Sequence, residues 1–133
     1  MANSLFTKII KGEIPCYKID ENEDFFAFLD ISPLSIGHTL VIPKQETDYI
    51  FSLDDELYKG LFLYAKKIAL AIEKVVDCKR IGIAVIGLEV PHAHIHLVPM
   101  NVMSDIDFKK AKLKLSNREF EEIAKKIQKA LVL

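Results

Sequence analysis

The sequence predicts an α+β fold: an antiparallel sheet with one long packed helix, a short N-terminal helix and a C-terminal helix. Three observations support this class. Apolar residues recur at helical spacing between positions 52 and 75, two β-rich runs flank an acidic turn near position 22, and residues 91–99 alternate as a strand does. At 133 residues, half of them hydrophobic, the chain has the size and composition of one globular domain.

The N-terminal part is predicted to form a short helix followed by three strands. Ser4 can cap the helix, and Gly12 ends it. The third strand stops at Pro43, because proline cannot donate a hydrogen bond to a neighbouring strand. A loop at residues 30–37 precedes that strand. The predicted bounds are residues 4–11 for the helix and 16–20, 25–29 and 39–42 for the strands.

A long helix is predicted in the middle of the chain. Ser52 is its expected N-cap, and the acidic residues 54–56 complement the positive end of the helix dipole. Six apolar side chains at helical spacing make the stripe that faces the core. They are Leu57, Leu61, Tyr64, Ile68, Ile72 and Val75.

Two further strands are predicted after the long helix. Residues 80–86 are nearly continuously apolar, which predicts a central position in the sheet. The strand at 91–99 follows after a short turn, so we expect the two strands to pair as antiparallel neighbours.

The C-terminal residues are predicted to form an amphipathic helix. Ser116 and Glu119 make a capping box at its start, and the helix runs to about Leu131. Its lysine-rich polar face is expected to be exposed to solvent. We therefore divide the single domain into a core at residues 1–103 and a C-terminal extension at residues 104–133.

The composition limits the classes of partner and location. A net charge of −1 provides no basic surface for long nucleic acids, so none is expected as a partner. The two cysteines have no metal-binding spacing and fit a reducing compartment. The polar start after Met1 and the absence of any apolar run near ~18 residues predict a cytoplasmic protein without a membrane anchor.

A row of histidines is the main chemical feature of the sequence. His92, His94 and His96 stand at every second position, so a strand would present all three rings on one face, roughly 6.6 Å apart. The apolar residues between them would face the core. The remaining histidine, His38, follows Gly37 at the start of another predicted strand, from which it can complete the group.

Three interpretations of this row compete. The rings can be structural core residues, although three at fixed spacing on one face argue against that. Two of them can bind zinc, but the outer pair lies roughly 13 Å apart and no nearby cluster offers a third ligand. In the third interpretation, a neutral imidazole attacks phosphorus because one ring nitrogen is held protonated and the other keeps its lone pair.

Four blocks in the sequence resemble the histidine triad (HIT) superfamily. Its signature, His-x-His-x-His and two apolar residues, matches residues 92–98 (HAHIHLV). Residues 6–15 (FTKIIKGEIP), 27–33 (AFLDISP) and 37–43 (GHTLVIP) match in family order. The chain looks most like the Hint-like nucleoside phosphoramidase branch. The resemblance implies a HIT-like fold and a homodimer that cleaves nucleotide conjugates through a nucleotidyl-histidine intermediate.

The resemblance also implies roles for individual residues. His94 would be the catalytic nucleophile toward the α-phosphate, His96 and His38 would contact the phosphate or the nucleophile, and His92 would help to hold the rings. Asp30 matches the carboxylate that binds ribose. No cofactor and no metal are implied. The apolar slot for the purine would consist of Leu5, Phe6, Ile9, Phe28, Leu29 and Ile31.

The sequence departs from the family pattern at two places. Glu89 stands where many relatives have a serine or threonine associated with the leaving group. A carboxylate there can favour a cationic amine, donate a proton if its pKa is raised, or simply be solvated. Ser4 and Thr7 occupy the spacing of paired cysteines that bind zinc in some relatives, so we expect no such zinc site.

The expected function is hydrolysis or transfer of purine nucleoside 5′-phosphoramidates or related AMP conjugates. A dinucleoside polyphosphate hydrolase using the same intermediate is the first alternative. A non-catalytic purine-nucleotide-binding regulator is the alternative from another class, and metal-dependent activity is a third.

Overall fold

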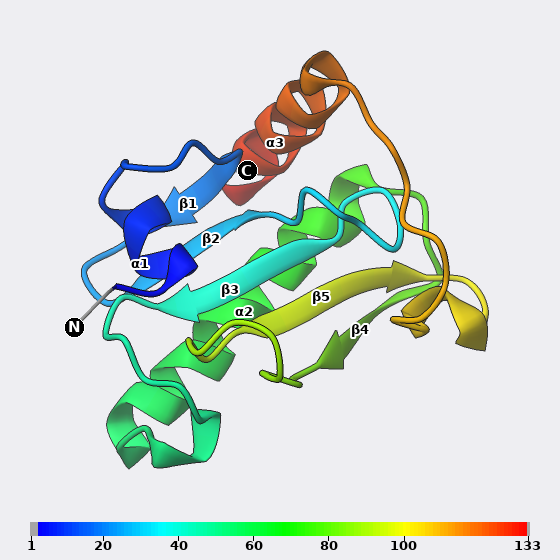
Figure 1. Cartoon of the computed structure of the whole chain (residues 1–133). Helices are drawn as coiled ribbons and strands as arrows, with labels where there is room; N and C mark the ends of the chain where they lie inside the picture. Colours follow the sequence, from blue (N-terminus) through cyan, green and yellow to red (C-terminus); the bar gives the residue numbers. More distant parts are fainter. Residues whose placement is uncertain (1–2, 133) are drawn as a thin grey trace.

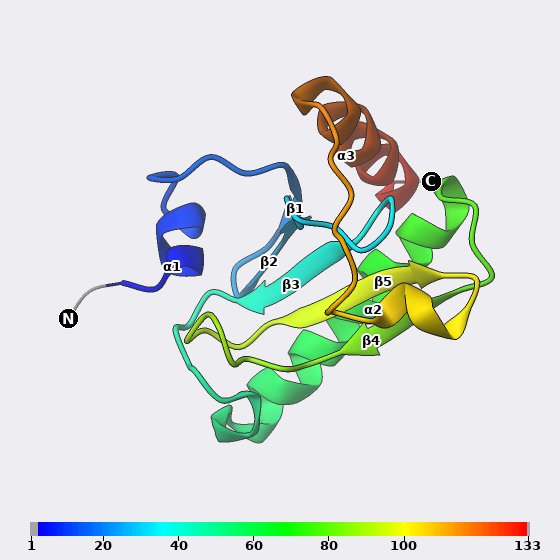
Figure 2. The same cartoon turned by 45° about the vertical axis from the view of Figure 1, so that its right-hand side comes forward.

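The computed structural model describes residues 3–132 and confirms the α+β class (Figure 1). All strand pairs of its five-stranded sheet are antiparallel, in the order β1-β2-β3-β5-β4. Helix α2 packs on one face, and the opposite face carries α1 and the connection to α3 (Figure 2). The elements are α1 (Leu5–Ile10), β1 (Lys18–Glu21), β2 (Phe25–Leu29), β3 (Thr39–Pro43), η1 (Ile50–Ser52), α2 (Asp55–Val75), β4 (Arg80–Ala84), β5 (Ile95–Met100), η2 (Met103–Ile106) and α3 (Asn117–Leu131).

The main core lies between the sheet and α2. The predicted stripe of α2 faces it: Leu61, Tyr64, Ile68 and Ile72 are buried, and the two end positions are partly buried. The predicted cap was wrong, because Ser52 belongs to η1 and the Asp54 side chain accepts the hydrogen bond from the Leu57 amide. The buried Leu53 separates the two turns, so the helix starts three residues after Ser52.

A second, smaller apolar cluster lies on the other face of the sheet. It joins Phe6 and Ile9 of α1 to the outward-facing side chains of β2 and β3. Those strand residues are Phe26, Phe28, Leu40 and Ile42. Because strand side chains alternate, β2 and β3 supply both cores and are buried along their whole length.

Strand β4 lies at the edge of the sheet, so its predicted central position was wrong. It does pair antiparallel with β5, as expected. The apolar run is partly exposed to solvent and is not buried on both faces of the sheet. The Ile83 side chain is 53% accessible, and Val85 beyond the strand is also exposed. An apolar run alone does not distinguish a buried central strand from an edge strand with an apolar outer surface.

The histidine row only partly belongs to a strand. β5 starts at Ile95, so His92 and His94 lie in the extended segment before it. That segment leaves the ladder because the Ala93 amide donates to the Thr47 carbonyl at 2.7 Å. The predicted alternation nevertheless holds, since the intervening apolar residues belong to the main core.

The C-terminal helix α3 packs into the main core. Its N-cap is Ser116, which forms the predicted capping box with Glu119. The ring of Phe120 stacks on Tyr17 at 4.9 Å, and the lysine-rich face is exposed as predicted. Across residues 3–132, none of the helices is long and apolar enough to cross a membrane.

Gly37, next to His38, adopts a backbone conformation that only glycine tolerates well. Its φ is +91°, and an added Cβ would lie 2.9 Å from a methyl group of Val76. Gly37→Ala is therefore expected to lower the free energy of unfolding by about 2–3 kcal/mol in urea denaturation. Gly12 is the matched control, because its φ is +79° but an added Cβ would contact nothing. Gly12→Ala should cost only about 1 kcal/mol, and equal losses would contradict the steric argument.

Candidate active site

A cavity of about 520 Å³ opens on the sheet face opposite α2. Its size lies in the usual range for small-molecule sites. All the site residues predicted from the sequence border it except His92, which is fully buried. The cavity thus brings α1, the loop at 30–37, the loop at 86–90 and the histidines together around one space.

His94 presents a free ring nitrogen at this cavity. Its Nδ1 lies 2.7 Å from the His92 carbonyl oxygen. A carbonyl only accepts, so we assign the proton to Nδ1, which leaves the Nε2 lone pair unprotonated. The rings of Phe6 and His96 pack edge-on against His94 at 5.0 Å and 4.9 Å and hold its orientation.

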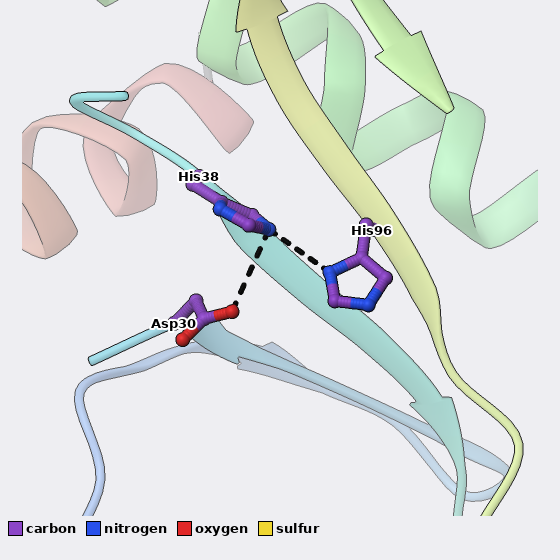
Figure 3. Close-up of side chains that lie close together, drawn as sticks. All are labelled: Asp30, His38 and His96. Atoms are coloured by element: carbon purple, nitrogen blue, oxygen red, sulfur yellow. Dashed lines mark hydrogen bonds and ion pairs between the residues drawn. The ribbon is translucent and has the colours of Figure 1, made fainter. Parts of the chain in front are cut away.

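His38 and His96 form a hydrogen-bond relay that begins at the backbone (Figure 3). The Leu34 amide donates to His38 Nδ1 at 3.0 Å, so the proton of His38 is on Nε2. That Nε2 donates to His96 Nδ1 at 3.0 Å, which places the His96 proton on its own Nε2. The relay therefore makes His96 Nε2 a donor, on a ring that borders the same cavity as His94.

Burial keeps the relay rings neutral. It lowers the pKa of His38 to about 4 and that of His96 to about 3. Neighbouring positive charge contributes less: Lys112 acts on His38, and His94 and His38 act on His96 only when they are protonated. Neutral rings are the protonation states that the tautomers of the relay require.

These pKa values predict a pH dependence of stability. The unfolded chain, with histidine pKa values near ~6.5, binds more protons than the folded chain down to about pH 4. The free energy of unfolding should therefore fall between about pH 7 and about pH 5, by at most roughly 1.4 kcal/mol per pH unit for each ring. Urea denaturation at the two pH values measures this, and His38→Gln should flatten the difference. An unchanged slope in that variant would contradict the assignment.

Asp30, His38 and His96 are close enough together to be considered as metal ligands. One potential ligand atom from each lies within 4.8 Å of the others. The relay argues against this use, because His38 Nε2 carries the proton that Leu34 forces onto it. Binding a cation there would cost both the Leu34 and the His96 hydrogen bonds. The donor set therefore fits a proton-ordered relay better than a metal site.

Asp30 borders the cavity between the histidines and the apolar wall. Its Oδ1 accepts from the Ser32 amide at 2.8 Å, and its Oδ2 lies 3.6 Å from His38 Nε2. Burial raises the pKa of this carboxyl, and the Ser32 hydrogen bond opposes the rise. An acceptor oxygen is thus held at a fixed place in a partly buried site.

The apolar wall is built from α1 and β2. Phe6 and Phe28 pack edge-on at 5.5 Å, while Leu5 and Ile31 are exposed at the cavity rim. Leu29 borders the cavity, but its side chain belongs to the main core because alternate residues of β2 face opposite sides. Glu89 is exposed on the loop at the far rim.

His92 is held by a polar cluster that sequence reasoning did not find. Its Nε2 donates to the Pro43 carbonyl at 2.8 Å, so its Nδ1 accepts from the Ser4 hydroxyl at 2.8 Å. Glu46 Oε1 accepts from the Thr7 hydroxyl and the Ser4 amide, both at 2.6 Å, and these bonds lower the pKa of Glu46 to about 2. The cluster fastens α1 to the histidine segment. Glu46 lies in an irregular loop, where no periodicity marks it.

The family comparison covers most of the chain. The family model described as HIT domain matches residues 11–103. An uncharacterized HIT-like protein of Borreliella burgdorferi is 36% identical over 135 residues, covering 96% of this chain and 97% of the relative.

Two further proteins add information on activity and fold. Adenosine 5′-monophosphoramidase hnt1 of Schizosaccharomyces pombe is 39% identical over 97 residues, covering 71% of this chain and 72% of the relative. The crystal structure of a HIT-like protein from Bartonella henselae, involved in cell-cycle regulation and holding an unknown ligand, matches with a TM-score of 0.82. It is 32% identical, with 96% of each chain covered.

Proposed function

The chain belongs to the HIT domain family, and from this we propose that it hydrolyses purine nucleoside 5′-phosphoramidates or related AMP conjugates through a nucleotidyl-histidine intermediate. The observation that carries the proposal is the free Nε2 lone pair of His94 at the cavity, on a ring that packs at 4.9 Å against the ring of His96. The phosphoramidase activity of the fission yeast relative supports the choice of substrate class.

The proposed reaction has two displacements. In the first, His94 Nε2 attacks the α-phosphorus; a nitrogen–phosphorus bond forms to the ring and the bond to the leaving amine breaks. The amine takes a proton from solvent and leaves. In the second, water attacks the phosphorus, the bond to the ring nitrogen breaks, the nucleoside monophosphate keeps the oxygen of the water, and one proton of that water returns to solvent.

The neighbouring groups fit the charges that develop. The His94 Nδ1–H continues to donate to the His92 carbonyl oxygen, which stabilises the positive charge on the substituted ring. His96 Nε2 donates to a phosphate oxygen. Asp30 Oδ2 accepts from the ribose hydroxyls, and the apolar wall with Phe6 and Phe28 covers the purine. Each part of the nucleotide thus has a chemically suitable partner among the residues that line the cavity.

One comparison of substrates tests this function. We expect kcat/KM to be higher for adenosine 5′-phosphoramidate than for diadenosine tetraphosphate, with AMP as the common product. The reverse order would favour the dinucleoside polyphosphate hydrolase. Tight AMP binding without turnover of either compound would favour a regulator, and activity lost to a chelator would favour a metal enzyme.

Glu89 is proposed to select the leaving group from the cavity rim. Its carboxylate attracts a leaving group that keeps a free ammonium, such as a diamine joined to AMP through only one of its two nitrogens. Glu89→Gln should lower kcat/KM for that conjugate about three- to tenfold, because an exposed charge pair contributes about 1 kcal/mol. The uncharged amide conjugate, adenosine 5′-phosphoramidate, is the control and should change little. Equal changes in kcat/KM for both substrates would show that Glu89 does not select the leaving group.

A homodimer and a cytoplasmic location complete the proposal. Strand β4 is an edge strand with the exposed apolar side chain of Ile83, and two copies can pair such edges around a two-fold axis. Light scattering at micromolar concentration tests this, and a monomer would contradict it. Cys16 and Cys78 carry free thiols, which fits a reducing compartment.

A further inference from the structure

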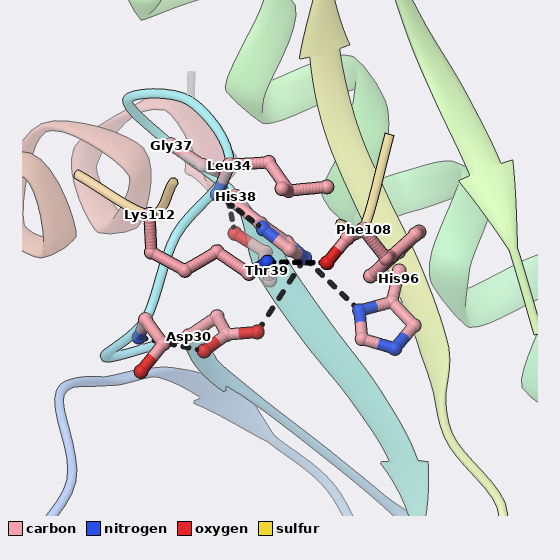
Figure 4. A network of polar contacts seen from close by, with 9 residues as sticks. Asp30, Leu34, Gly37, His38, Thr39, His96, Phe108 and Lys112 are labelled. Carbon is pink, nitrogen blue, oxygen red and sulfur yellow. Dashed lines mark hydrogen bonds and ion pairs between the residues drawn. The ribbon is translucent and has the colours of Figure 1, made fainter. Parts of the chain in front are cut away.

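A segment of the C-terminal extension closes one side of the cavity. We call residues 107–115, between η2 and α3, the strap. The Leu113 amide donates to the Pro33 carbonyl at 2.9 Å, which ties the strap to the loop that precedes His38. The Phe108 ring packs edge-on against His96 at 4.7 Å (Figure 4). The strap lies beyond the residues matched by the family model, which end at 103.

Lys112 brings an anchored positive charge to the cavity. Its Nζ donates to the carbonyl oxygen of Phe108 at 2.6 Å (Figure 4). It also donates to the carbonyl oxygen of Lys110 at 3.1 Å. An ammonium group has three N–H donors, so within residues 3–132 one of them is left without a partner. The carbonyls fix the position of the charge while they leave this donor available to a ligand.

The charges around the cavity show which part of a ligand Lys112 meets. Among the described residues that line it, Lys112 is the only lysine or arginine, while Asp30 and Glu89 are acidic. Burial raises the pKa of Asp30 and lowers that of His38; the charge of Lys112 opposes the first shift and adds to the second. Lys112 and Asp30 thus line the same cavity, close enough for the charge of Lys112 to act on the Asp30 carboxyl.

We propose that Lys112 forms the ribose subsite together with Asp30 and makes the protein select ribonucleotides over deoxyribonucleotides. This inference rests on the proposed function, which places a nucleotide in the cavity. A ribose hydroxyl is both a donor and an acceptor. The carboxylate of Asp30 accepts from the hydroxyl proton, and the free N–H of Lys112 donates to the hydroxyl oxygen. A deoxyribose leaves one or both protein groups unpaired in a partly buried place, which costs binding affinity.

Calorimetric binding of AMP, 2′-deoxy-AMP and 3′-deoxy-AMP tests the subsite without requiring turnover. We expect wild-type protein to bind AMP more tightly than at least one deoxy analogue. Lys112→Met should weaken AMP binding about tenfold and reduce that discrimination, because an analogue that lacks the contact has nothing to lose. Lys112→Gln keeps a donor without the charge and provides a second variant if Lys112→Met does not fold.

The controls separate a ribose contact from a loosened strap. Lys109→Met removes an exposed lysine from the same segment and should leave all three affinities unchanged. If Lys112 only held the strap in place, its loss would weaken the binding of AMP and of both analogues by the same factor. This result would overturn the proposal. Wild-type protein that does not discriminate would overturn it as well. Turnover of adenosine 5′-phosphoramidate, measured separately, reports on the hydrolase function alone.

Discussion

Replacement of His94 with alanine is expected to lower kcat for adenosine 5′-phosphoramidate by at least about 10⁴-fold. The proposed reaction forms its covalent bond on His94 Nε2, and the described neighbours do not offer an equivalent nitrogen. His96 Nε2 carries the relay proton, and His92 is buried with both ring nitrogens bonded. The measurement is single-turnover kinetics with substrate labelled at phosphorus, followed by denaturation and mass analysis of the histidine segment.

The control for this variant is binding rather than rate. AMP should still bind His94→Ala within about threefold of wild type, because the ribose and purine contacts lie elsewhere in the cavity. Label on His94 during wild-type turnover is the positive result. Turnover by His94→Ala at the wild-type rate would eliminate the covalent mechanism and leave direct attack by water as the alternative.

Replacement of His38 with leucine is expected to lower kcat by about 10²–10³-fold, although His38 forms no bond to phosphorus in the proposed reaction. Without the His38 donor, His96 Nδ1 loses the hydrogen bond that defines its tautomer. His96 then presents a donor to the phosphate for only part of the time. kcat and KM measured separately should show the loss mainly in kcat, because the donor acts on charge that develops in the transition state.

His38→Gln is the matched variant for this test. The glutamine amide can donate from near the position of Nε2, so it should restore at least about tenfold of the kcat that leucine loses. A merely structural role for His38 predicts a different pattern, in which kcat follows the thermal stability of the two variants. Equal kcat in the leucine and glutamine variants would show that the relay does not set the protonation of His96.

The sequence predicted those features that depend on local periodicity and caps. The alternation at residues 92–97 correctly divided the histidines from the core side chains, and the Ser116 capping box started α3 as expected. The errors arose where neighbours in space decide the outcome. Asp54 rather than Ser52 caps α2, because Leu53 packs into the core between them. The apolar run of β4 did not mark a central strand, because part of it is exposed at the edge of the sheet.

The parts of the candidate site that the sequence missed come from long-range contacts. His38 and His96 are 58 positions apart, and their hydrogen bond depends on the pairing of β3 with β5. Glu46 and Lys112 lie in irregular segments, where no spacing links them to His92 or Asp30. A resemblance limited to residues 4–100 carries no information on the strap, so Lys112 was visible only after the chain was folded.

The protonation of the two histidines in the relay depends on a backbone amide, that of Leu34. Leu34 is buried and does not border the cavity, yet its N–H decides which nitrogen of His38 is protonated, and through it the state of His96. The position of a reactive proton is thus encoded in the shape of the loop at residues 30–37. Substitutions in that loop, at residues that do not border the cavity, can therefore change the protonation of His96 while every histidine stays in place.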